Sequence, residues 1–327
     1  MTHSKRQTLF VHLGTEKTGT TSVQSVLTRH EATVRAAGVS YIKAFRRGVC
    51  HNSLTRMMRD DHNDDLIREK IAREMRYTQQ KNLLISTETA FGKHSTKKMI
   101  NVFQGIENLE IKPFFYFRRQ DLFLESLAKQ RGKTGHLAGD YMPFILARRE
   151  KADYADFLRS MRRQFQDIKW VAHLYDRAHL RQQDAVSDLF HQIGLDGVAV
   201  AKDTKMAANR TPSLPFIAAL SECAFSDPSE RRALLRCAMD ESPAAFFKSG
   251  DLLTAEQREE LMDGYRDCNA YMSEEVGVDL TKLFHDDVSW AGASHAITDP
   301  EEWAWAVQAA RLEIERLTRM VRHASAA

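Results

Sequence analysis

The sequence contains few glycines and prolines, the residues that interrupt helices and strands, and it has no long hydrophobic run. Its 327 residues include only 15 glycines and 7 prolines, with 43% hydrophobic and 9% aromatic residues. This composition excludes collagen-like, low-complexity and wholly disordered chains and allows a sizeable hydrophobic core. No apolar run approaches the roughly 18–20 residues that a membrane helix requires. The polar, basic start, Met1–Thr8, has no signal-peptide core.

Cysteine is also scarce. The four cysteines form no CxxC pair and no disulfide framework: Cys50, Cys223, Cys237 and Cys268. Together with the missing membrane and signal segments, this predicts a protein of the reducing cytoplasm.

The sequence has almost no net charge, but its positive and negative residues are unevenly distributed along the chain. The net charge of +3 argues against a general nucleic-acid coat. Residues 110–163 carry 12 Lys or Arg against 7 Asp or Glu, whereas residues 226–302 carry 7 against 18. We therefore expect an anionic ligand to meet the middle of the chain; solvated helix faces of opposite sign are the alternative.

Strand-like apolar runs alternate with helical patterns over the first 200 residues. The predicted strands are Thr8–Leu13, Val39–Ile42, Asn82–Ser86, Ile111–Phe117 and Lys169–Leu174. Helical spacing covers Thr20–Ala37, Asp64–Gln80 and roughly residues 92–104, 120–131 and 153–166, with an apolar stripe in the second of these at Leu66, Ile67, Ile71 and Met75. The alternation predicts an α/β fold with three layers, in which helices flank a parallel sheet.

The strand pattern ends after Leu195, and helices are predicted at Ser213–Phe225, Ser229–Asp240 and Thr254–Val276, the last with a capping-box start. A heptad-like seam then follows in Pro300–Arg322, at Trp303, Val307, Ala310, Ile314, Leu317 and Val321. This helix is expected to pack on its own domain or, alternatively, to form a homodimer. We expect one α/β domain over residues 1–285 and a tail with an amphipathic helix over residues 286–327.

The most informative segment, HLGTEKTGTTS, begins at His12, after a predicted strand and before a predicted helix. In that setting, successive backbone N–H groups and the helix N-terminus converge on an anion. Two glycines, Gly14 and Gly19, let the backbone approach a phosphate, and the hydroxyls of Thr18, Thr20 and Thr21 add donors. The segment therefore predicts a phosphate-binding loop.

The position of the lysine separates this loop from the triphosphate loop GxxxxGK[ST]. In that pattern a lysine follows the second glycine and reaches the β- and γ-phosphates. Here Thr20 follows Gly19, and Lys17 lies two positions before that glycine. A kinase or NTPase therefore loses most of its support and remains an alternative.

Two segments resemble sulfotransferases that use 3′-phosphoadenosine 5′-phosphosulfate (PAPS). The run KTGTTSVQ, which begins at Lys17, is similar to the family's 5′-phosphosulfate loop. The family also carries an Arg at a strand end and a Ser eight residues later, commonly as R-N-P-x-D-x-x-x-S. Here Arg118, Asp121 and Ser126 match in type and spacing, although Arg-Gln replaces Asn-Pro. The resemblance covers roughly residues 8–285.

The resemblance implies a P-loop sulfotransferase fold and a function. A sulfuryl group would pass from PAPS to an acceptor hydroxyl on a small molecule, with a saccharide slightly favoured and no metal required. Lys17 would stabilise the leaving phosphate, the loop would hold the 5′-phosphate, and Arg118 and Ser126 would bind the 3′-phosphate. A non-catalytic nucleotide-binding partner protein is a further alternative.

Two residues are candidates for the base that deprotonates the acceptor. Glu88 follows the predicted strand Asn82–Ser86 and resembles the catalytic glutamate of carbohydrate sulfotransferases. His51 is the rival, because other branches of the family use a histidine. The alternative roles are structural: a helix cap or salt bridge for Glu88, and a packed loop histidine for His51.

Overall fold

The computed structural model describes residues 6–15, 18–78, 80–133, 141–200, 212–225, 227–247, 250–285 and 299–326. The chain divides into two compact units that interleave along the sequence. The first unit comprises Met1–Arg119, Asp153–Asp203 and Asp267–Leu280; the second comprises Gln120–Ala152, Thr204–Arg266 and Thr281–Ala327. The boundary predicted at residue 285 is followed by residues 286–298, which lie outside the described part, and it remains a prediction.

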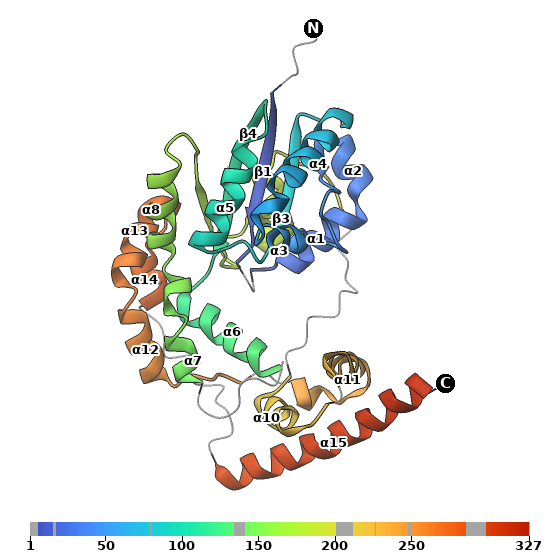
Figure 1. Ribbon diagram of the computed structural model, residues 1–327. Helices are drawn as coiled ribbons and strands as arrows, with labels where there is room; N and C mark the ends of the chain where they lie inside the picture. The colour runs from blue at the N-terminus through green and yellow to red at the C-terminus, as the bar shows by residue number, and fades with distance from the viewer. Residues whose placement is uncertain are drawn as a thin grey trace. The chain divides into compact units, whose positions relative to one another are not determined.

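The first unit is built on a five-stranded parallel sheet (Figure 1). Its strands are β1 (Gln7–Leu13), β2 (Val39–Tyr41), β3 (Asn82–Thr87), β4 (Leu109–Phe117) and β5 (Val171–Leu174), in the order β2-β3-β1-β4-β5. β1 lies between β3 and β4, and every pairing is parallel. The α/β fold and the parallel sheet predicted from the sequence are therefore confirmed.

Helices flank the sheet because both of its faces carry apolar side chains. On one face, Phe115 of β4 packs with Phe157 of α8 (Tyr154–Gln164), and α5 (Lys93–Gln104) lies beside β4 and α8. On the other face, α1 (Thr20–Arg29) and α9 (Ala185–Gln192) share a core with the strands. That core includes Val23, Leu27, Leu84, Phe114, Tyr116, Leu189 and Phe190.

The other helices of the first unit refine the sequence predictions. They are α2 (Glu31–Ala36), α3 (Asn52–Met57), α4 (Asp64–Tyr77) and α13 (Arg266–Val276), with short 3-10 turns η1 (Asp61–Asn63) and η3 (Arg181–Gln183). The helix predicted over Thr20–Ala37 is wrong as a single element, because the chain leaves helical geometry at His30. In α4 the predicted stripe is buried except at Leu66, which is 39% exposed.

The second unit is helical. It contains α6 (Gln120–Lys133), α7 (Met142–Leu146), α10 (Leu214–Glu222), α11 (Pro228–Glu241), α12 (Ala255–Asp263) and α15 (Pro300–Ala326), the 3-10 turns η2 (Arg149–Ala152) and η4 (Ala244–Phe247), and most of α14 (Leu280–His285). The helices predicted at Ser213–Phe225 and Ser229–Asp240 are confirmed. The one predicted over Thr254–Val276 consists of two, α12 and α13, although its predicted capping box at Thr254 and Gln257 is present.

The heptad-like seam of α15 is covered within the same unit. It packs on α10 and α11, as Figure 1 shows. The contacting residues include Phe216, Leu220, Leu234, Val307, Ala310, Ile314 and Leu317. Packing on its own domain, one of the two predicted roles of this helix, is therefore what the structure shows. No helix in the described ranges has the length and apolar character needed to cross a membrane.

Candidate phosphate-binding site

The loop between β1 and α1 lies at the carboxyl end of an interior strand. Gly14 and Thr15 follow β1, and Gly19 precedes α1 with φ 71°, in the left-handed region that glycine adopts without strain. A Cβ on Gly14 would lie 2.5 Å from Cγ2 of Thr20, so a larger residue there would displace that side chain. Lys17, the predicted leaving-group partner, lies outside the described residues.

Two buried threonines fix the course of this loop. The Thr15 hydroxyl donates to the carbonyl of Tyr116 on β4, and the Thr18 hydroxyl donates to the carbonyl of Thr15 at 2.8 Å. The Thr18 proton is therefore used inside the loop. Thr21 is exposed in the first turn of α1. Among the described residues, the backbone N–H groups at the start of α1, rather than the Thr18 hydroxyl, are therefore the candidate donors to an anion.

The carboxylate of Glu88 lies beside this loop. The Thr20 hydroxyl, at the start of α1, donates to Oε1 of Glu88. Glu88 follows β3 and is partly exposed. Its backbone N–H donates to Oδ1 of Asn52 at 2.9 Å, and the same oxygen accepts from the Thr87 hydroxyl at 3.1 Å. Two predicted site residues, Thr20 and Glu88, are therefore in contact, and Asn52 positions the second.

His51 has a different environment from Glu88. It is fully buried, with Nε2 2.8 Å from the carbonyl of Ile42 and Nδ1 3.3 Å from the backbone N of Ser86. Nδ1 also lies 3.2 Å from the carbonyl of Ser86. The Ile42 carbonyl can only accept a hydrogen bond, so the shorter contact places the proton of the neutral ring on Nε2. Burial lowers the pKa of His51 to about 4. Both ring nitrogens are therefore engaged with the backbone, and we infer that His51 joins β2 to β3.

The strand order places a topological switch point between β1 and β4. After β1 the chain moves toward β2 and β3, whereas after β4 it moves toward β5. Open parallel sheets bind ligands in the crevice at such a point, outside the carboxyl ends of the strands. The loop at Gly14 follows β1, and Arg118 directly follows β4. Both therefore flank the position where this architecture forms a binding site.

Tyr175, at the end of β5, was not predicted as part of the site. Its hydroxyl oxygen would lie 3.0 Å from a Cβ on Gly19, and its backbone N–H donates to the carbonyl of Phe117 at 2.6 Å. Burial raises the pKa of Tyr175, and the nearby charge of Arg118 opposes that rise. Tyr175 therefore borders both the loop and the β4 end. The signal in the sequence was its position immediately after the last predicted strand.

The second predicted motif divides between the two units. Arg118 is half-buried in the first unit, and Ser126 is half-buried on α6 of the second. Asp121 of the same motif is fully buried and paired with Arg258 of α12 at 2.8 Å, which gives it a structural part within the second unit. A shared role of Arg118 and Ser126 remains a prediction from their sequence spacing.

Neither a metal site nor a similar protein indicates the function of this chain. Across the described ranges, no three His, Cys, Asp or Glu side chains are grouped so that they could hold a metal ion. No protein-family model matches the chain, and no curated protein or solved structure is detectably similar to it. A functional proposal therefore rests on the fold, the loop and the motifs.

Proposed function

We propose that this protein is a PAPS-dependent sulfotransferase that modifies an acceptor hydroxyl. The observation that supports this most is the loop between β1 and α1, with the Glu88 carboxylate held against its end by Thr20. A phosphate-binding loop next to a carboxylate brings an anion site and a proton acceptor together. The sequence around Lys17 selects a sulfotransferase among the functions that such a loop serves.

The described part of the loop fits a phosphate group. The missing side chains of Gly14 and Gly19 let Thr20, Glu88 and Tyr175 pack close to the loop backbone. The start of α1 supplies N–H groups and the positive end of the helix dipole. PAPS would supply an activated sulfuryl group on its 5′-phosphate. Lys17 would neutralise the charge that develops on the phosphate oxygen as the sulfuryl group leaves, so that the loop contributes placement and charge stabilisation.

We assign the base to Glu88 rather than His51. Glu88 is partly exposed at the carboxyl end of β3, where an acceptor can approach, whereas His51 is buried with both nitrogens engaged. Glu88 would take the proton of the acceptor hydroxyl, while Thr20 and Asn52 hold Glu88 in place. A general base must lie within hydrogen-bond reach of the proton that it removes.

Arg118 is the proposed contact for the 3′-phosphate. A guanidinium at a strand end can donate two parallel hydrogen bonds to one phosphate, and that contact would distinguish PAPS from ADP or ATP. Ser126 is retained as a second donor on the strength of the sequence motif alone. The acceptor is proposed as a small molecule with a free hydroxyl, with saccharides tested first.

Turnover tests the proposal. Purified protein would be incubated with PAPS and a panel of saccharide and phenol acceptors, and release of 3′,5′-diphosphoadenosine would be followed. We expect acceptor-dependent release that Lys17→Ala reduces by roughly two orders of magnitude or more, while Lys70→Ala, at an exposed lysine of α4, retains the wild-type rate. Magnesium-dependent ATP hydrolysis without release of the diphosphate would contradict the proposal and favour an NTPase.

A further inference from the structure

One face of the sheet carries charged side chains on an interior strand. Side chains alternate between the two faces of a strand, so Glu110, Lys112 and Phe114 of β4 share a face. Phe114 is buried in the core with α1 and α9, whereas Lys112 and Glu110 have side chains 48% and 40% exposed. Parallel sheets are normally covered on both faces. Among the described residues, Glu110 and Lys112 are therefore only partly covered.

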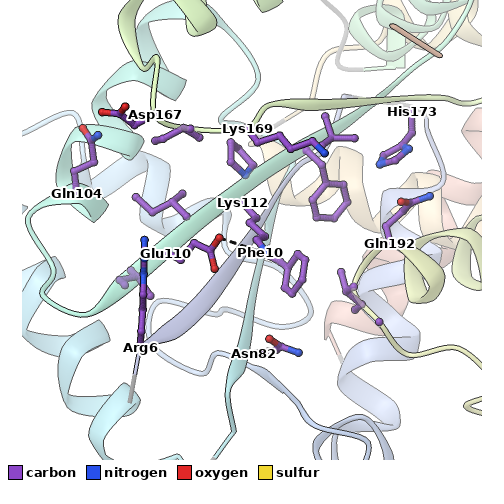
Figure 2. Close-up of a pocket in the computed structure, with 18 of the residues that line it drawn as sticks. Arg6, Phe10, Asn82, Gln104, Glu110, Lys112, Asp167, Lys169, His173 and Gln192 are labelled. Atoms are coloured by element: carbon purple, nitrogen blue, oxygen red, sulfur yellow. Dashed lines mark ion pairs between the residues drawn. The ribbon is translucent and has the colours of Figure 1, made fainter. Parts of the chain in front are cut away.

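A pocket of about 910 Å³ lies at the amino-terminal part of β4 and takes lining residues from both faces of that strand (Figure 2). On the face shared with Lys112, its apolar lining comes from Phe10 of β1, Phe114 of β4, Val171 of β5, and Ile193 just after α9. A volume of this size lies within the range of small-molecule sites. Polar or charged residues make up about half of the lining, beside the apolar residues named above, so the pocket offers both kinds of contact to a ligand.

The charged residues that line the pocket leave an excess of positive charge. Glu110 accepts from the Thr8 hydroxyl at 3.0 Å and lies 3.6 Å from the Lys112 amine, so these two charges offset each other. Arg6 and Lys169 are exposed lining residues, and no ion pair is recorded for either among the described residues. The opposing negative charge in the lining is that of Asp167, which Figure 2 shows near Gln104. The lining therefore favours an anion, at Lys169.

His173 and Gln192 add neutral hydrogen-bonding groups to the lining. His173 lies on β5 with its ring against Phe114 and Tyr116, and Figure 2 shows it close to Gln192. Burial lowers the pKa of His173 to about 4, so the imidazole is neutral near pH 7. No hydrogen bond to its ring nitrogens is recorded within the described ranges. These groups can therefore bind a hydroxyl or amide of a ligand without adding charge.

We propose that this pocket binds a small organic anion with a flat apolar body, such as an aromatic carboxylate, sulfonate or sulfate ester. The apolar body would lie against Phe10 and Phe114, the anionic group would meet Lys169, and a polar substituent would reach His173. The pocket lies along the amino-terminal halves of β1 and β4, whereas the loop at Gly14 follows the carboxyl end of β1. It is therefore a second site, and its existence does not depend on the proposed transferase activity.

Two fluorescent probes of nearly the same shape test this site. 1-Anilinonaphthalene-8-sulfonate carries the anionic group, and N-phenyl-1-naphthylamine has the same rings without it. We expect wild-type protein to bind the sulfonate more tightly, and Lys169→Glu to weaken sulfonate binding by about tenfold or more through charge reversal at close range. The neutral probe should change less than threefold or so, because its contacts are apolar. Lys151→Glu, at an exposed lysine of η2, is the matched control.

Hydrogen exchange and competition locate the probe. Binding should slow amide exchange in residues 109–114 and 191–194, and saturating 3′,5′-diphosphoadenosine should leave sulfonate binding unchanged. Equal affinity for the two probes, equal losses in Lys169→Glu and Lys151→Glu, or displacement by the diphosphate would each overturn the proposal. Failure of the transferase assay alone would leave these readouts unaffected, so the two proposals fail separately.

Discussion

At the scale of single residues, the crowding around Gly14 links the loop to Glu88. A Cβ there would lie 2.5 Å from Thr20 Cγ2 and 3.3 Å from Glu88 Cγ. Gly14→Ala should therefore displace both side chains, lower the free energy of unfolding by about 1–3 kcal/mol, and weaken binding of 3′,5′-diphosphoadenosine. Urea denaturation and calorimetry would measure the two effects.

Gly264→Ala is the control for that substitution. Gly264 has right-handed helical geometry, and a Cβ there would meet only the Leu261 carbonyl, at 3.4 Å. We expect a change within about 1 kcal/mol, in either direction. Equal effects of the two substitutions would show that the loop does not need a glycine at position 14.

Glu88→Gln separates catalysis from binding at the same scale. The amide is isosteric and its oxygen can still accept from the Thr20 hydroxyl, but it cannot take a proton. With an acceptor identified by the turnover assay, kcat should fall by about 10²–10⁴-fold, while the affinity for 3′,5′-diphosphoadenosine stays near that of wild type. His51→Gln should act mainly on stability, since it disturbs bonds to Ile42 and Ser86. A folded His51→Gln protein that loses turnover, beside an active Glu88→Gln protein, would contradict the assignment.

At the scale of elements, a buried charge cluster joins α6 to α12. Arg258 is completely buried and contacts Asp121, Glu125 and Asp251, the last at 3.2 Å. Arg258→Met would remove the buried guanidinium that these three carboxylates share and should cost about 3–5 kcal/mol of stability. Arg266→Met removes an exposed pair with Asp263 and should cost under about 1 kcal/mol. Chemical denaturation of both variants would measure the difference, and similar costs would contradict this account.

Two leucines of α15 test how this helix is held. Leu317 is fully buried against α10 and α11, whereas Leu312 is 58% exposed. Leu317→Ala should lower the stability of the second unit by about 2–5 kcal/mol, and Leu312→Ala should change it by no more than about 0.5 kcal/mol. The opposite order would show that the exposed face of α15 is the one that packs, as a homodimer through that face would require.

The sequence predicted the positions of strands and helices better than the breaks within helices. Every strand of the sheet was found, because buried parallel strands give nearly continuous apolar runs. The breaks at His30 and Gly264 were missed, since helical periodicity continues across them. Glu88 was predicted as a site residue because it follows a buried strand, and its contact with Thr20 came only from the structure. Asn52 and Tyr175 could not be identified, because their importance depends on which strands are neighbours in the sheet.

At the scale of the whole molecule, the first unit should lose stability in mild acid. Burial, the main cause in each case, lowers the pKa of His12 to about 3 and of His51 and His173 to about 4. These values lie below about 6.5 for an unfolded histidine, so as pH falls the unfolded chain takes up protons first. The neutral rings make their full contribution to the free energy of unfolding above about pH 7, and this contribution is lost progressively between about pH 6.5 and pH 4. From pH 7 to 5.5 the three should cost about 3–4 kcal/mol together.

Urea denaturation at the two pH values would measure this loss. His173→Phe removes one of the three groups and should reduce the pH-dependent loss by about a third. His94→Phe, at an exposed position of α5, should leave it unchanged. A loss of the same size in His173→Phe as in wild type would show that this ring does not contribute.

The central claim, that the loop at Gly14 and the β4 end form a PAPS site, is tested most directly by calorimetry. 3′,5′-Diphosphoadenosine, ADP and ATP would be titrated into wild type, Arg118→Ala and Arg59→Ala, the last at an exposed arginine of the same unit. The account predicts that wild type and Arg59→Ala bind the diphosphate at least about tenfold more tightly than ADP, and that Arg118→Ala loses this preference. Equal or tighter binding of ATP, unaffected by Arg118→Ala, would contradict it.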